Sequence, residues 1–337
     1  MTGGIITGVG KSLPARIVSN REIAERLGVD DEWILSRTGI RERRHASRGE
    51  TTSTLGAEAA TEALGHAGIS AGDVDLIITA TCTPDHLFPS TACLIQAAIG
   101  AGRAGAFDLN AACSGFIYAL AAAQASVTTG LARRVLVVGA DVLSRFVNPD
   151  DPITAPLFGD GAGAAVVEAG DGEPIRFDLK ADGNGAQHVI LEAGGSRTPA
   201  SKDSVERGLH CLTMAGREVF RSAVRAMSSV GQSLGRDGFD LLIGHQANLR
   251  ILNEAAQEMG VEPERLFVNI DRVANTSAAS IPIAIHEAWQ EGRLTPGTRL
   301  LLLAFGAGFT WAGALLDWTL PSAAHSTTAE DLAAVTP

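Results

Sequence analysis

The sequence predicts an α/β protein built from two similar halves. Short apolar segments of strand length alternate with helical segments, which is typical of mainly parallel sheets. The segments "DVDLIITAT" and "RRVLVVGAD" have counterparts, "GFDLLIGHQ" and "TRLLLLAFG", at an offset of 165 positions. Two segments that repeat at one offset indicate an internal duplication. Each sheet needs helices on both faces, so we expect the halves to share a helical layer.

The elements follow in order from these patterns. The first half opens with a strand over "GGIITGVG" and helices near 20–27, 31–37 and 52–67. Continuous apolar runs then predict strands buried on both faces, and a helix begins at Cys113 after "AFDLNA". In the second half "LFVNI" answers "AFDLN", and Ala278 takes the position of Cys113. We therefore divide the chain into residues 1–170, 171–320 and a polar tail, 321–337, which we expect to be poorly ordered.

Composition narrows the function. Of 337 residues, 45% are apolar and 19% are charged, and the formal charge of −11 argues against general nucleic-acid binding. No apolar run is long enough to span a membrane, and the first residues do not resemble a signal peptide, so we expect a cytoplasmic protein with no membrane partner. The four cysteines form no CxxC pair and no cluster with zinc-like spacing, so we expect neither a disulfide framework nor a metal site.

Three chemically capable residues lie where predicted strands end and helices begin. Cys113 starts a helix, His245 ends the strand "LLIGH", and Asn275 lies at the corresponding turn of the second half. Each alone could be structural, as a buried thiol, a satisfied histidine or a helix cap. Together they suit acyl transfer, in which a thiolate attacks a thioester or amide and the other two donate hydrogen bonds. A helix start would lower the thiol pKa. The order Cys–His–Asn also occurs in papain-like proteases, but "AACSGF" lacks their local signature.

A family resemblance rests on longer motifs. These are "DDEWILSRTGIRERR", "FDLNAACSGF", "LFGDGAGAAVV", "LTMAGREVF", "GHQANLRI", "ANTSAASIPIAI" and "AFGAGFTWAG", in this order between about residues 3 and 318. With them the sequence resembles the β-ketoacyl-acyl-carrier-protein synthase III family, the initiating condensing enzymes of the thiolase superfamily. The resemblance implies a five-layered αβαβα thiolase fold, usually a homodimer. It also implies condensation of an acyl-coenzyme A primer with malonyl-acyl carrier protein through an acyl-cysteine, with no cofactor.

The resemblance also implies roles for individual residues. Cys113, His245 and Asn275 would be catalytic, and the backbone N–H groups of Cys113 and Ala307 would form the oxyanion hole. The remaining roles are coenzyme A binding by Trp33, Arg37 and Asn248, and an acyl pocket with Phe88 and Phe158, where Phe88 would close the partner subunit's pocket. The spacing of Arg217, Arg221 and Arg225 places them on one helix face, and with Arg250 they form a basic patch. The resemblance implies an acidic carrier protein as the partner that would dock on this patch.

Some positions depart from the family pattern. Pro152 stands where relatives often carry an arginine that clamps adenine, which leaves open whether coenzyme A or a carrier protein delivers the first acyl group. Ala274 and Ala307 replace common glycines. "GDGAG", residues 159–163, lacks the spacing of a phosphate loop, and we interpret it as a tight structural loop.

Other functions remain to be weighed. An acyltransferase on the same fold would pass the acyl group to a hydroxyl or amine without decarboxylation, and some of these replace the asparagine. A silent partner subunit or acyl-binding module would usually lose the cysteine. Chalcone-synthase-like enzymes share the triad but fit "GHQANLRI" less well, and thiolases need a second active cysteine in the second half. The sequence leaves open the primer and the choice between fatty-acid and polyketide initiation.

Overall fold

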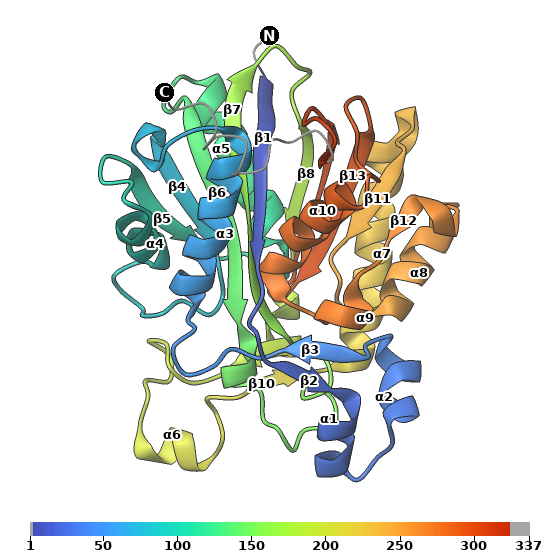
Figure 1. Ribbon diagram of the computed structural model, residues 1–337. Helices are drawn as coiled ribbons and strands as arrows, with labels where there is room; N and C mark the ends of the chain where they lie inside the picture. Colours follow the sequence, from blue (N-terminus) through green and yellow to red (C-terminus); the bar gives the residue numbers. More distant parts are fainter. Residues whose placement is uncertain (1–2, 324–337) are drawn as a thin grey trace.

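The computed structural model describes residues 3–323 as a layered α/β fold (Figure 1). Two five-stranded sheets stand side by side, one from each half of the chain. The expectation of a poorly ordered tail falls mainly on residues 324–337, which lie outside the described residues.

The first sheet has the order β1-β7-β6-β4-β5. Strand β4 pairs in parallel with β5 and β6, and β7 runs antiparallel to β6 and β1. The strands are β1 (Gly3–Ser12), β4 (Leu76–Ala80), β5 (Gly105–Leu109), β6 (Arg134–Val142) and β7 (Asp160–Gly170).

The second sheet, β12-β11-β13-β14-β8, repeats this pairing. The strands are β8 (Arg176–Ala181), β11 (Leu241–Gly244), β12 (Leu266–Phe267), β13 (Arg299–Gly306) and β14 (Thr310–Asp317). β4 and β11, like β6 and β13, begin 165 residues apart, so the predicted duplication is confirmed.

Helices and short strands complete the fold. The helices predicted over 20–27 and 52–67 are present with those bounds, and the helix predicted over 31–37 extends to Thr38. The helices are α1 (Asn20–Leu27), α2 (Asp31–Thr38), α3 (Thr52–Ala67), α4 (Thr91–Ile99), α5 (Gly115–Thr128), α6 (Lys202–Glu206), α7 (Gly216–Leu234), α8 (Leu249–Glu258), α9 (Ile270–Val273) and α10 (Ser280–Gln290). Two small ribbons pair β2 (Ile17–Ser19) with β3 (Glu42–Arg44) and β9 (Val189–Leu191) with β10 (Leu212–Met214).

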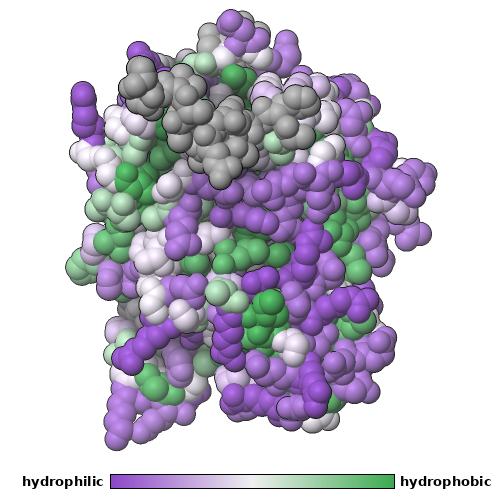
Figure 2. Space-filling model, in the orientation of Figure 1, coloured by the Kyte–Doolittle hydropathy of each residue, from purple (hydrophilic) through white to green (hydrophobic). Residues whose placement is uncertain are grey.

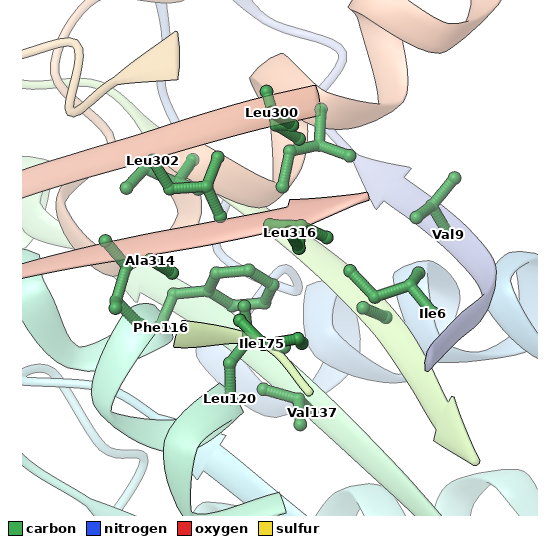
Figure 3. Close-up of a cluster of buried hydrophobic side chains, with 14 of the residues drawn as sticks. Ile6, Val9, Phe116, Leu120, Val137, Ile175, Leu300, Leu302, Ala314 and Leu316 are labelled. Carbon is green, nitrogen blue, oxygen red and sulfur yellow. The ribbon is translucent and has the colours of Figure 1, made fainter. Parts of the chain in front are cut away.

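The helices form three layers around the two sheets. α3 and α4 cover the outer face of the first sheet, and α7 and α8 cover the outer face of the second. α5 and α10 lie between the sheets, as predicted for a shared layer, and Figure 3 shows Phe116 and Leu120 of α5 packed among strand residues of both sheets. A helix that is apolar on all sides must be buried. Ten consecutive residues of α10, Ser280 to Trp289, are buried accordingly.

The outer helix α3 is bounded by its own sequence. Thr51 caps its first turn in a capping box with Thr54, and the chain leaves the helix at Gly68 with φ +67°. Such a cap satisfies backbone donors that have no partner within the helix. The left-handed conformation at the end favours glycine.

The surface is mixed rather than uniformly apolar. On the face shown in Figure 2, hydrophilic side chains predominate and hydrophobic patches are small and separate. Within residues 3–323, none of the helices has both the length and the apolar character that crossing a bilayer requires.

The "GDGAG" segment is a strand and not the predicted loop. β7 begins at Asp160, whose buried carboxylate accepts hydrogen bonds from the Ala46 N–H at 2.7 Å and from the Ser144 N–H and hydroxyl at 2.8 and 2.5 Å. Pairing with both β6 and β1 keeps these residues extended. The glycines therefore serve close packing: a Cβ at Gly163 would lie 2.7 Å from Pro282 Cβ.

Gly8 lets β1 approach α3, and we predict that Gly8→Ala destabilises the protein. The added Cβ would lie 2.2 Å from the Ala63 carbonyl oxygen, so α3 would have to move. Such overpacking costs about 1–3 kcal/mol in the free energy of unfolding, which urea denaturation measures. Gly65→Ala, on the same helix with open space around it, is the control and should stabilise by about 0.5–1 kcal/mol. Equal stability of the two variants would contradict this account of the packing.

Candidate active site

Two equivalent turns meet at the candidate site. The 3₁₀ turns Ala112–Ser114 and Ser277–Ala279 directly precede α5 and α10 and are 165 residues apart. Ala112 and Ser277, at matching positions, both have positive φ, +46° and +51°. Cys113 lies in the first turn and Ala278 in the second, as the sequence predicted, but the α-helix itself begins two residues after Cys113.

The three predicted catalytic side chains come together in one cavity. Cys113, His245 and Asn275 all line a space of about 1330 Å³, which lies where the turns, β11 and the loop after β13 meet. Cys113 is half-buried, while His245 and Asn275 are 2% and 6% exposed. The sequence places the three residues on separate elements, and the structure brings their side chains into one cavity.

Burial controls the Cys113 thiol. Desolvation raises its pKa to about 12, against the opposing effect of the hydrogen bond from Sγ to Ser277 Oγ, 3.5 Å long. Asp141 raises it further, and the backbone N–H of Cys113 lowers it. The expectation of a lowered thiol pKa is therefore wrong: loss of water around the sulfur is the largest influence on the pKa and raises it. The resting nucleophile is a thiol.

Cys82 belongs to the same cluster, which the sequence did not indicate. It follows β4, lines the cavity, and its Sγ lies 3.6 Å from Ser277 Oγ and 3.4 Å from Asp141 Oδ1. Burial raises the pKa of Cys82 well above its ordinary value, and Asp141 adds to this. Cys82 is thus a second half-buried thiol beside the nucleophile, but it does not lie in the turn that carries Cys113.

His245 is neutral and oriented by Ser280. Burial lowers its pKa to about 3. Its Nδ1 lies 2.6 Å from Ser280 Oγ, which also accepts the Gln246 N–H at 3.3 Å. Among the described residues the Ser280 hydroxyl proton has Nδ1 as its acceptor, so the ring carries its own proton on Nε2. The geometry therefore makes His245 a hydrogen-bond donor toward the cavity.

The Asn275 side chain is also held so that it can donate a hydrogen bond. Its Oδ1 accepts the Ser277 N–H at 2.9 Å, so the side-chain NH₂ remains to donate. Its backbone is clamped to the segment before β7, because Asn275 N donates to the Leu157 carbonyl and Gly159 N donates to the Asn275 carbonyl, each at 3.0 Å. Both side chains thus offer donors and no free acceptor to a bound oxygen.

The duplication explains why the Cys113 N–H is free. Asp141 and Gly306 occupy equivalent positions, 165 residues apart, as do Ala278 and Cys113. Asp141 Oδ2 accepts the Ala278 N–H at 3.1 Å. At Gly306 a Cβ would lie 2.7 Å from the Cys113 nitrogen, so only glycine leaves that N–H open. Ala307, the other predicted oxyanion donor, follows directly and lines the cavity.

The predicted coenzyme A residues lie at the cavity mouth. Trp33, Arg37, Pro152 and Asn248 all line the cavity. The Arg37 guanidinium lies 4.4 Å from the centre of the Trp33 ring, which leaves the opposite face for another planar group. Asn248 is already engaged: its Oδ1 caps α8 through the Arg250 N–H, and its Nδ2 donates to the Arg37 carbonyl at 2.9 Å. It therefore joins α8 to α2.

The two predicted pocket aromatics differ. Phe158 is buried, bridges to Asn275 and lines the cavity. Phe88 is 86% exposed and does not line the cavity of its own chain. Its predicted reach into a second subunit stays a prediction.

The predicted basic patch lies on exposed helix surfaces. Arg217, Arg221 and Arg225 are exposed on α7, and the Arg250 guanidinium lies 5.5 Å from the Phe220 ring. Within residues 3–323 none of the four forms an ion pair. Arg217, Arg221 and Arg250 also line the cavity mouth.

The supporting residues Ser277, Ser280 and Asp141 escaped sequence reasoning. Serine and aspartate at these positions carry no distinctive spacing, and their roles depend on contacts across more than 30 residues. The only signal was the 165-residue offset, which places Ser277 opposite Ala112.

A duplicated five-layered α/β fold with a cysteine, a histidine and an asparagine in one cavity defines a thiolase-fold acyl-transferring enzyme. The family described as 3-Oxoacyl-[acyl-carrier-protein (ACP)] synthase III matches residues 107–183, and its C-terminal counterpart matches residues 232–318. The β-ketoacyl-[acyl-carrier-protein] synthase III of Roseiflexus sp. (strain RS-1) is 48% identical, over 93% of this chain and 98% of its own.

Solved structures agree. The 3-oxoacyl-[acyl-carrier-protein] synthase III of Aquifex aeolicus VF5 has 41% identity and a TM-score of 0.86, covering 94% of this chain and 100% of that one. The priming β-ketosynthase of the R1128 polyketide pathway has 35% identity and a TM-score of 0.87, covering 95% and 97%. The chain belongs to the β-ketoacyl-acyl-carrier-protein synthase III family of condensing enzymes, and the predicted thiolase fold is confirmed.

The raised pKa of Cys113 predicts its reactivity with pH. With a pKa of about 12, the thiolate fraction should rise about tenfold per pH unit and should not level off near pH 8.5, where an ordinary thiol does. Alkylation of Cys113 by iodoacetamide, followed by peptide mapping between pH 6 and 10, measures this. A plateau in the rate below about pH 9 would contradict the assignment of a protonated resting thiol.

Proposed function

We propose that the protein condenses an acyl-coenzyme A primer with malonyl-acyl carrier protein, releasing carbon dioxide and giving 3-oxoacyl-acyl carrier protein. One observation carries the proposal: the half-buried Cys113 thiol faces the same cavity as two side chains, His245 and Asn275, held as donors. Its family membership supports the reaction class. No cofactor is required for these steps.

The first half-reaction loads the cysteine. Cys113 Sγ forms a bond to the acyl carbon, the bond to coenzyme A sulfur breaks, and the thiol proton passes overall to that leaving sulfur. The charge that develops on the acyl oxygen is received by the N–H of Cys113, which Gly306 leaves open, and by that of Ala307. Since the thiol pKa is raised, deprotonation accompanies attack and does not precede it.

The second half-reaction needs side-chain donors. Loss of carbon dioxide from the malonyl group leaves an enolate, whose oxygen receives hydrogen bonds from His245 Nε2–H and the Asn275 NH₂. The enolate carbon then attacks the acyl carbon, the bond to Cys113 breaks, and the sulfur takes up a proton. A neutral histidine suits this role. With a pKa of about 3, His245 is uncharged at neutral pH and does not take up a proton, so it acts as a hydrogen-bond donor.

Two surface features support the proposed partners, an acidic carrier protein and a second copy of this chain. Arg217, Arg221 and Arg250 at the cavity mouth, and Arg225 on the same face of α7, form no ion pair within residues 3–323 and suit an acidic carrier protein, since complementary charge accelerates encounter. For a homodimer, the edge strand β5 offers unpaired backbone groups, and Phe107 on it is 42% exposed. The Phe88 loop adjoins this edge, because Asp108 of β5 accepts the Thr91 and Ala92 N–H groups that begin α4. A cytoplasmic location remains a prediction.

We predict that His245→Ala and Asn275→Ala impair decarboxylation far more than loading. Loading can use backbone donors, whereas removing an oxyanion donor costs about 10²–10³ in rate. The measurement follows carbon dioxide release from malonyl-acyl carrier protein separately from acyl-enzyme formation by intact mass. Cys113→Ala is the control and should retain no acyl group.

The same experiment tests the function. Acyl loading without carbon dioxide release in the native protein would favour the non-decarboxylating acyltransferase. An acyl group on Cys82, Cys93 or Cys211 would overturn the choice of nucleophile. Normal decarboxylation in either donor variant would overturn the roles of His245 and Asn275.

Phe88 should limit primer length if it closes a partner's pocket. We predict that Phe88→Thr raises kcat/KM for octanoyl- over acetyl-coenzyme A. The change should be graded, because each methylene accommodated in an apolar pocket is worth about 1–3 kcal/mol. Leu131→Thr changes another highly exposed apolar residue, at 77% against 86% for Phe88, and is the control that should leave the ratio unchanged. An unchanged ratio in the Phe88 variant would remove this residue from the pocket.

A further inference from the structure

Three metal-ligating side chains meet outside the catalytic cavity. Glu62 and His66 come from α3, and His286 comes from α10, with one donor atom of each within 4.8 Å of the others. None of the three lines the catalytic cavity. Figure 1 shows α3 and α10 on either side of β1, whose backbone completes the cluster. No local sequence pattern indicates this cluster, because His66 and His286 are 220 residues apart.

Two of the side chains are already oriented for an ion. His66 Nδ1 lies 2.6 Å from the Val9 carbonyl, which can only accept, so Nδ1 carries the proton and Nε2 keeps its lone pair. Glu62 Oε2 accepts the Lys11 N–H at 2.6 Å. Metal-binding histidines commonly donate their second nitrogen to a backbone carbonyl, and ligating carboxylates are hydrogen-bonded in the same way.

His286 is the third and most buried member. It is 0% exposed, and its Nε2 lies 3.1 Å from Glu62 Oε1, while Nδ1 has no partner among residues 3–323. It stands in a central helix that is otherwise largely apolar. Burial of this polar ring is costly, and the nitrogen that faces the cluster is Nε2, which lies against Glu62.

We propose that these three residues bind a divalent transition-metal ion, with zinc as the best fit. Two imidazole nitrogens and a carboxylate oxygen form a donor set that zinc accepts, with a fourth position left for water. Metal–ligand distances of about 2.0–2.2 Å require the donor atoms to draw closer. Glu62 and His66 are half-buried and have room to do so. A shallow hollow lined by Thr61, Glu62 and Ile99 gives access from solvent.

The chemistry of binding limits its strength. His286 must give Nε2 to the ion and carry its proton on Nδ1, where no described residue accepts it. A missing outer partner costs about 10–100-fold in metal affinity. Binding would link the outer helix α3 to the central helix α10 across β1. The ion therefore stabilises the folded state and leaves the condensation reaction unchanged.

The experiment uses the full chain, stripped with chelator and titrated with Zn²⁺. We expect one ion per chain by calorimetry and a Tm that rises with Zn²⁺ concentration. Replacement by Co²⁺ should give the visible absorption of a four- or five-coordinate ion with nitrogen ligands. His66→Gln and Glu62→Gln should lose all three effects, and both should still be acylated at Cys113, which shows that they fold.

Glu58→Gln is the matched control. It lies one turn earlier on α3, where its carboxylate accepts the Ser12 hydroxyl at 2.6 Å, and should keep the ion. Zinc binding that survives His66→Gln, or that is lost on Cys93→Ser, would overturn the proposal in favour of an adventitious surface site. The absence of a Tm shift in the native protein would overturn it as well. If a glutamine variant fails to fold, the Co²⁺ spectrum of the native protein decides, since thiolate ligands give a distinct charge-transfer band.

Discussion

The burial of α5 and α10 between two sheets is the constraint on which the rest of the structure depends. Neither sheet can cover its inner face alone, so each half needs the central helix of the other. The 3₁₀ turns that precede these helices are therefore brought against each other at the centre of the molecule. Cys113 lies in one of them and Ser277 in the other, and their contact is a consequence of the shared layer. The active site therefore lies where the turns that precede the two central helices meet.

The same burial sets the chemistry of the site. Desolvation raises the pKa of Cys113 and lowers that of His245, so both groups rest uncharged. Ser280 and the Ser277 N–H then determine which hydrogen atoms point into the cavity. Charge is created only when a substrate carbonyl or carboxylate enters, and it meets dipoles that are already aligned. Such preorganised donors require little rearrangement as the reaction proceeds.

The sequence predicted what repeats and what is contiguous. The 165-residue offset predicted the duplication, and the apolar runs located β4, β5 and β6 and their counterparts in the second half. The triad was found because Cys113 and His245 follow strands and because the offset placed Asn275 at the counterpart of the Cys113 turn, although in the structure it follows α9 and not a strand. What escaped was set by contacts across the chain: the thiol pKa, the nearness of Cys82, and the meeting of His66 with His286. "GDGAG" was misjudged because glycine indicates a turn locally, whereas here two neighbouring strands hold it extended.

The pairing of Asp141 with the Ala278 N–H has a consequence for how the fold came to host catalysis. The duplicated scaffold contains two matching anion receptors, one in each half. In one, the Asp141 carboxylate accepts the Ala278 N–H and holds the turn in place. In the other, the equivalent residue is Gly306, which has no side chain, so the Cys113 N–H stays available to a substrate. The Asp141 carboxylate thus lies against the Ala278 N–H in the way that the anionic oxygen of the reaction's intermediate would lie against the Cys113 N–H.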